Sequence, residues 1–298
     1  MTQPDLRKGI ACMVTATLVF AAQDAVSRHL GEGNNVFVIV MIRYWFFAAF
    51  VVALALRSPG GLRRVLRPHH LLIQIARGLI LVSQICILLL AFVKLGLVAT
   101  HSIFTCFPLL VAALSGPVLG EHVGWRRWTA IAVGAVGVLV ILNPLGEQIL
   151  SPWMILPILG AFVFALYGLL TRYVAEKDGA TVSFFWAGVT GAAAITVLGL
   201  WFWQPMPRAD WPYMAVLCCT GILGHWCMIR AYDYAEASAV QPFSFLQLMW
   251  IAIIGVAFFG ETLTPNVVIG AAIVVMAGLF TLWRAEQKGE PPTPVTRP

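Results

Sequence analysis

In this chain of 298 residues, 60% of the amino acids are hydrophobic and only 11% are charged. Soluble domains are about 45–50% apolar and about 25% charged, so the composition excludes an ordinary water-soluble globular protein. The formal net charge of +6 is therefore interpreted as a signal of membrane topology, and no nucleic-acid partner is expected.

Apolar runs recur along the chain at lengths that suit membrane-spanning helices in a lipid bilayer. A span needs about 20 mainly apolar residues. Ten candidates fit: 9–29, 36–56, 71–93, 98–119, 126–142, 152–172, 181–203, 211–232, 238–259 and 264–283. The links between them are too short for a soluble domain. The sequence therefore predicts an all-α integral membrane protein with ten transmembrane helices.

Positive charge is distributed unevenly over the links between these spans. If the N-terminus lies inside, most Lys and Arg residues fall in cytoplasmic segments, whereas the external links hold Arg28, Lys94 and Arg208. Cytoplasmic loops of membrane proteins carry an excess of Lys and Arg. We therefore expect a multi-pass membrane protein with both termini in the cytoplasm.

The second half of the chain repeats the first. Residues 97–142 and 237–282 align without a gap, and each copy has a Gly-Glu pair, ending in Glu121 or Glu261, between two apolar runs. We expect each glutamate to favour the N-terminus of the span that follows it. Glu121 is predicted near the cytoplasmic surface and Glu261 near the external one.

A weaker repeat covers the first three spans and matches Arg28 with Arg172. Each half then holds five spans, an odd number, so the halves are predicted to cross the membrane in opposite senses. The expected units are residues 1–146, the inverted repeat 147–285 and a disordered cytoplasmic tail, 286–298. A substrate site is expected where the halves face each other.

Short motifs give the chain a resemblance to a known family. They are Gly120-Glu121, Gly260-Glu261, Arg43-Tyr44 and the tight links Ala91-Phe92-Val93-Lys94 and Ala231-Tyr232-Asp233-Tyr234. Together with two five-span repeats, they resemble the EamA type of the drug/metabolite transporter superfamily. Within it, the chain is most similar to bacterial aromatic amino-acid exporters. The resemblance implies a secondary carrier of the bacterial inner membrane, an exporter or facilitator that moves aromatic and other large neutral amino acids by alternating access. Other metabolites or drugs are the alternative cargo.

Missing motifs narrow the mechanism further. The sequence has no phosphate-binding loop for an ATP-driven motor and no hydrolase signature. Its six cysteines show no metal-binding spacing, so no cofactor is expected. A membrane-embedded lipid-modifying enzyme with His101 or His225 as its base is a second alternative. Polar groups scattered over many spans favour a carrier over an enzyme. The carrier is expected to be a monomer, with a weak dimer as the alternative.

Polar and aromatic residues inside the spans are the candidates for substrate binding, because such polar groups are costly in lipid and face cavities or partners. The set comprises Gln23, Arg43, Gln84, His101, Tyr167, Trp186, His225, Phe243, Gln247 and Trp250.

Asp24 is the candidate for proton coupling, although Arg28 stands one turn away on the same helix and is an alternative ion-pair partner. Arg43 lies too deep in its span to reach the surface, so it needs Asp24 or a substrate carboxylate. Arg77 is expected to extend to the cytoplasmic surface.

Two further patterns concern the equivalent spans 98–119 and 238–259. Pro108 and Pro117 are predicted to interrupt the first of them. In the second, Phe243, Gln247 and Trp250 recur with a helical period and predict one aromatic face with an amide in it. This face either contacts an amphiphilic solute or packs against lipid.

Overall fold

The computed structural model describes residues 6–57, 61–119, 124–142, 151–175, 177–234 and 240–287. Within these ranges every regular element is a helix. The first part of the chain forms α1 (Leu6–Gly33), α2 (Val36–Arg57), α3 (Gly61–Val65), α4 (Leu71–Leu95), α5 (Leu97–Phe104), α6 (Phe107–Leu119) and α7 (Trp125–Leu142). The second forms η1 (Pro152–Met154), α8 (Ile155–Ala175), α9 (Ala180–Trp201), η2 (Arg208–Asp210), α10 (Trp211–Tyr234), η3 (Gln241–Phe245), α12 (Leu246–Phe259) and α13 (Pro265–Gln287).

The described helices are long and apolar enough for a membrane. Six segments clearly qualify as spans: Leu6–Gly33, Val36–Arg57, Leu71–Leu95, Leu97–Val118, Pro152–Val174 and Thr181–Trp201. Trp128–Leu142, Phe243–Phe259 and Pro265–Phe280 are shorter apolar helices. Lipid offers no hydrogen bonds, so a spanning segment must satisfy its backbone internally, as a helix does. The expectation of an all-helical, multi-pass architecture is confirmed for the described residues.

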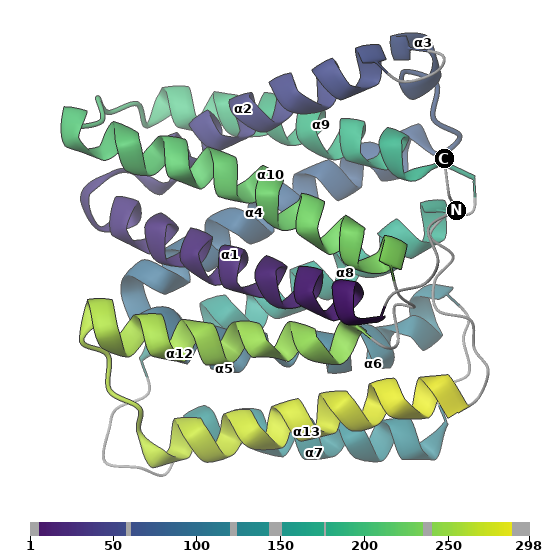
Figure 1. The fold of residues 1–298 in the computed structure, drawn as a ribbon, viewed down its shortest axis with the longest axis vertical. Coiled ribbons are helices and arrows are strands. Elements are labelled where there is room, and N and C mark those ends of the chain that lie inside the picture. The colour runs from purple at the N-terminus through teal and green to yellow at the C-terminus, as the bar shows by residue number, and fades with distance from the viewer. Residues whose placement is uncertain are drawn as a thin grey trace.

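The long helices lie side by side, and the start of α1 and the end of α13 lie at the same end of the bundle (Figure 1). We refer to this end as the end that holds the chain termini. α1 packs mainly against α10 and α12, α2 against α9, and α4 against α8 and α9. α7 and α13 pack against each other along one edge of the molecule (Figure 1).

Glycines let the α7–α13 pair approach closely. A Cβ atom at Gly137 would lie 2.9 Å from the carbonyl oxygen of Gly270, and one at Gly270 would lie 2.6 Å from that of Gly137. Small residues permit such close backbone contact between membrane helices.

The helical path breaks in the span that contains Pro108. α5 ends at Phe104 and α6 begins at Phe107, so Pro108 stands in the first turn of α6. A proline is tolerated there because the amide of the first turn has no helical partner. The interruption predicted at Pro108 is confirmed. The one predicted at Pro117 is wrong, because Pro117 lies inside α6, which continues to Leu119.

Candidate transport site

A largely buried carboxylate joins three helices. Asp24 on α1 places its Oδ2 atom 3.0 Å from Nε2 of His101 on α5. The same oxygen accepts a hydrogen bond of 3.1 Å from the side-chain amide of Gln247 on α12. The exposed fractions of the Asp24 and His101 side chains are 13% and 6%. A carboxylate at this depth needs such partners, and the ring of Phe92 stacks on His101 at 5.2 Å.

The expected pair between Asp24 and Arg28 is not formed. Arg28 instead makes an ion pair with Glu261 and a second one, of 3.2 Å, with Glu32. Its guanidinium also lies over the ring of Phe259, 4.2 Å from the centroid. The carboxylate of Glu261 approaches from the end of α12, so Arg28 is neutralised one turn away from Asp24.

Arg43 on α2 is a cation that no carboxylate pairs with in the described part of the chain. Its Nη2 atom lies 4.0 Å from the position of a Cβ atom at Gly221, and Oε1 of Gln23 lies 3.4 Å from the same point. Gly221 on α10 thus leaves the space between these two polar groups free of a side chain. The sequence analysis predicts that Arg43 needs an anionic partner, either Asp24 or a substrate carboxylate. The structure shows that Asp24 contacts His101 and Gln247 instead.

Several buried polar atoms around this region lack hydrogen-bond partners within the described residues. They are Oε1 of Gln23, the hydroxyls of Tyr44 and Thr100, and Nε1 of Trp250. Buried polar groups are normally hydrogen-bonded, and each exception needs an explanation. A polar solute bound beside Gln23 and Trp250 would supply the missing partners.

His225 lies on α10, one turn from Gly221. Its Nδ1 atom is 2.7 Å from the carbonyl oxygen of Gly221. The rings of Phe20 and Phe184 contact it edge-on at centroid distances of 5.2 and 5.8 Å. Its own helix and two phenylalanines therefore fix the ring, with Arg43 within electrostatic reach.

Other predicted site residues lie away from Asp24. Tyr167 on α8 contacts Arg77, whose guanidinium lies 5.1 Å from the ring centroid. Trp186 on α9 donates a 2.8 Å hydrogen bond to the carbonyl of Val65. Gln84 is buried on α4.

The predicted face of Phe243, Gln247 and Trp250 is not continuous, because Phe243 belongs to the 3-10 helix η3 rather than to α12. Phe243 packs with Met13, whereas Gln247 bonds to Asp24 and Trp250 packs against the main core. A change from 3-10 to α geometry alters the residue spacing, so the regular period does not carry across it.

The prediction that Arg77 reaches the surface is wrong. Its exposed fraction is 1%, and it donates hydrogen bonds to Gln74 and to Thr171. Neutral polar side chains on α4 and α8 surround the guanidinium, so it does not have to extend to water.

Sequence reasoning missed an aromatic cluster that connects His101 with Tyr167. Phe104 contacts the ring of His101 at 6.1 Å and that of Phe164 at 5.5 Å. Phe164 in turn contacts Phe107 at 5.0 Å and Tyr167 at 6.0 Å. In so apolar a sequence, phenylalanine alone gives no signal. The sequence signal that could have indicated the cluster is the spacing of three residues from His101 to Phe104 and from Phe164 to Tyr167, because residues three apart lie on the same helix face.

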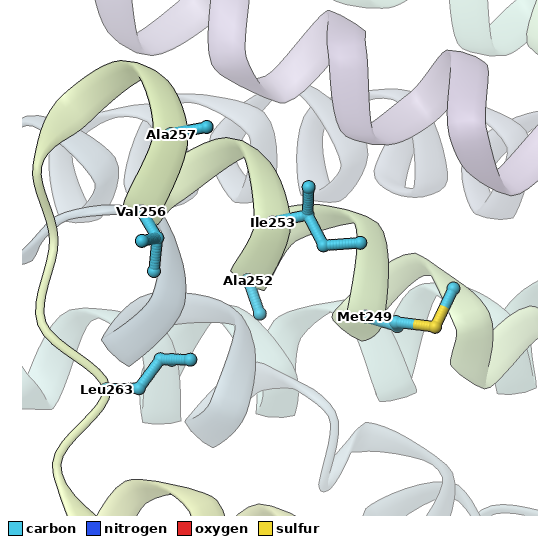
Figure 2. A pocket seen from close by; sticks show the side chains of 6 residues that line it. All are labelled: Met249, Ala252, Ile253, Val256, Ala257 and Leu263. Carbon is cyan, nitrogen blue, oxygen red and sulfur yellow. The ribbon is translucent and has the colours of Figure 1, made fainter.

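A shallow groove on α12 lies apart from this site. Figure 2 shows its lining of Met249, Ala252, Ile253, Val256, Ala257 and Leu263. All six side chains are apolar, and those on α12 project from the face opposite Gln247. The groove offers no partner for a polar solute, so Asp24 and Arg43 remain the candidates.

A second buried carboxylate fixes the end of the bundle that holds the chain termini. Asp178, in the link between α8 and α9, accepts backbone hydrogen bonds of 2.7 Å from His69 and 3.3 Å from His70, and one of 3.0 Å from the side chain of Gln74. Burial by itself would raise the pKa of Asp178, but these hydrogen bonds outweigh it and hold the pKa below its ordinary value. The carboxylate thus ties this link to the start of α4.

We expect Asp178→Asn to destabilise the protein at neutral pH. The lowered pKa means that the ionised carboxylate stabilises the fold fully above its unfolded pKa of about 3.9, and that this contribution is lost as pH falls through the folded pKa. Hydrogen bonds to a charged group contribute about 1.5–3 kcal/mol each. Thermal unfolding in detergent should show a large difference from the parent at about pH 7 that shrinks toward about pH 2. Asp210→Asn, with one amide partner, Asn34, is the control, and a pH-independent difference would contradict the prediction.

Comparisons with known proteins agree with this architecture. The model of the EamA-like transporter family matches residues 7–143 and 151–283. The chain belongs to this family. The expectation of a transporter rather than an enzyme is thereby confirmed, and the long apolar helices agree with a multi-pass bacterial membrane protein.

Named relatives cover nearly the whole chain. An S-adenosylmethionine uptake transporter of Rickettsia bellii is 24% identical over 279 residues, which span 92% of this chain and 93% of the relative. A riboflavin transporter of Vibrio cholerae is 27% identical over 285 residues, or 94% and 95% of the two chains. A solved crystal structure with 15% identity superimposes with a TM-score of 0.60 over 94% of this chain and 98% of its own. That likeness concerns the fold.

Proposed function

We propose that this EamA-like transporter is a secondary carrier for zwitterionic solutes that combine an α-amino acid head with an aromatic body. Large neutral amino acids, aromatic ones included, are the simplest members of this class. The single observation that supports the proposal most is the Arg43 cation beside Gln23, which pairs with no carboxylate of the described ranges, while His101 and Gln247 hold Asp24 separately.

The two polar centres suit the two charges of an amino acid. Arg43 would bind the carboxylate, because a guanidinium offers several donors in a fixed fork. Asp24 would attract the ammonium group, and the free Oε1 of Gln23 would accept a hydrogen bond from it. Neutral groups such as Gln247 contribute about 0.5–1.5 kcal/mol net per hydrogen bond, which allows a carrier to release its cargo.

The aromatic side chains near the polar centres suit a planar body. Trp250 packs beside the core, and Phe92 and Phe104 flank His101. Aromatic pairs contribute about 0.5–1.5 kcal/mol beyond area burial. Tyr167 and Trp186, although farther along the bundle, are proposed to contact larger cargo. Gln84, His225 and Phe243 would line the path rather than hold the head group.

The names of two relatives refine the proposed substrate class. S-adenosylmethionine carries an α-amino acid head and a planar purine, whereas riboflavin is planar and has no carboxylate. Arg43 is better explained by the first kind of cargo than by the second. A riboflavin-like or cationic drug-like solute is the alternative.

We also propose that the halves 1–146 and 147–285 form an inverted repeat, with both termini in the cytoplasm. The packing of the helices supports the repeat, and the distribution of Lys and Arg supports the orientation. Exchanging the halves converts the α1–α10 contact into α8–α4, and the α1–α12 contact into α8–α6, and all four occur. The contacts α2–α9, α5–α12 and α7–α13 convert into themselves. Alternating access by movement of one repeat against the other is then the expected mechanism.

Purified protein in liposomes tests the proposed function. We expect saturable uptake of labelled tryptophan and phenylalanine, about tenfold faster than that of alanine at low concentration because of the aromatic contact and area burial. S-adenosylmethionine should compete with tryptophan, and riboflavin should not. Equal rates for alanine and tryptophan, or transport of riboflavin or cationic dyes without any amino acid, would overturn the proposal. Empty liposomes and the Arg57→Gln variant, exposed at the end of α2, are the controls.

A further inference from the structure

Glu261 lies in the link between α12 and α13, which Figure 1 shows at the end of the bundle opposite the start of α1 and the end of α13. Its carboxylate oxygens accept backbone hydrogen bonds of 2.7 Å from Leu97 and 2.8 Å from Val98, the first residues of α5. The same carboxylate forms the ion pair with Arg28 of α1. The side chains of Arg28 and Glu261 are only 14% and 13% exposed. α1, α5 and the end of α12 are therefore joined by one side chain.

The backbone around this carboxylate is shaped to receive it. Gly96 has a positive φ of 87°, and a Cβ atom there would lie 2.6 Å from Oε1 of Glu261. A Cβ atom at Gly255 would lie 3.1 Å from Oε2. Gly260, with φ of 62°, lets the chain turn back so that the amide of Glu261 donates to the carbonyl of Gly255 at 3.0 Å. A glycine is required at each close approach or left-handed turn.

This junction lies directly outside the candidate transport site. Arg28 is four residues beyond Asp24 on α1, and Leu97 is four residues before His101 on α5. Because residues four apart share a helix face, the two helices are joined twice, once at Asp24–His101 and once, a turn farther out, at Arg28–Glu261. The outer junction separates the inner one from the membrane surface at this end.

We infer that Glu261 is the gate residue for this end of the transport path and the positioning residue for His101. With Glu261 bound to Arg28 and to the start of α5, the site is closed at the end opposite the termini, and α5 is held so that His101 meets Asp24. Opening this end requires the carboxylate to leave Arg28, which frees α1 to move away from α5 and α12. This inference rests on the proposed transport function, but its test does not require a substrate.

Accessibility of a cysteine placed in the site tests the gate. Gln23→Cys introduces a thiol on α1 at the face that meets Gly221. Its rate of reaction with a membrane-impermeant thiol reagent is measured in sealed vesicles. The rate of the chain without this cysteine is subtracted, because the native cysteines also react. The reagent is added to each side separately. Glu261→Gln keeps one acceptor oxygen, enough for one of the two α5 amides, and loses the charge that holds Arg28. We expect about tenfold faster labelling from the side of Glu261, because one charge-assisted bond shifts an open–closed equilibrium by about that factor.

A second variant separates the gate from a structural role. Arg28→Gln leaves the contacts of Glu261 with α5 intact and should speed labelling from the same side. Glu32→Gln removes the other, more exposed carboxylate at Arg28 and should leave labelling unchanged. Equal acceleration from both sides would indicate general loosening and would overturn the inference, as would no acceleration in either variant. Slow labelling of the parent together with a failed uptake panel would reject only the proposed substrate class.

Discussion

Replacing Arg43 by Gln is expected to lower tryptophan uptake into liposomes by about 100-fold, because removing one partner of a buried charge pair costs about 2–5 kcal/mol. The effect should appear as a raised KM, since the guanidinium would hold the carboxylate in the bound state. Arg43→Lys keeps the charge but not the planar fork, so it should recover part of the uptake.

The matched control for Arg43 is Arg57→Gln on the same helix, because Arg57 is exposed and distant from Asp24. Tryptophanol, which lacks the carboxylate, should be insensitive to Arg43→Gln if it is carried. Normal tryptophan uptake by Arg43→Gln, with correct folding shown by gel filtration in detergent, would contradict a role for Arg43 in binding the carboxylate.

Asp24→Asn is expected to reduce tryptophan uptake at least tenfold and to remove its response to a pH gradient. Asp24 is the carboxylate that meets both His101 and Gln247, and an asparagine has no ionisable group and no charge to balance the substrate ammonium. A carboxylate inside a membrane span is a candidate for coupling the movement of a proton to the movement of the substrate. The measurement is uptake with and without an imposed gradient.

The control for Asp24 is Glu32→Gln, because Glu32 is also on α1 but its side chain is 47% exposed. His101→Gln should keep part of the uptake, because a neutral amide can still hydrogen-bond to Asp24. A gradient response that persists in Asp24→Asn would show that Asp24 orders His101 and Gln247 without carrying protons.

The membrane architecture could be predicted from the sequence because it follows from local composition. Runs of about 20 apolar residues located the spans, and Pro108 located the break between α5 and α6. Depth within a span identified Arg43 and Asp24 as residues that need partners. These inferences require no knowledge of which helices touch.

Pairing between distant residues could not be obtained in this way. Arg28 and Glu261 are 233 positions apart, and a nearer carboxylate, Asp24, offered an equally good local explanation. The expected role of Glu261 was also misplaced, because it caps α5 rather than the helix that follows it. Its repeat equivalent, Glu121, lies outside the described residues. Local helix rules favour neighbours at four residues, whereas the fold brings the competing partner from another helix.

The glycine contact between α7 and α13 has a consequence for biogenesis. α7 ends at Leu142, and α13 begins only at Pro265, so the ribosome must make most of the second half before α7 can meet its partner. Until then, the surface around Gly137 faces lipid or other nascent helices. The protein therefore cannot be completed as two halves folded in succession, and its assembly waits for the last helix to enter the membrane.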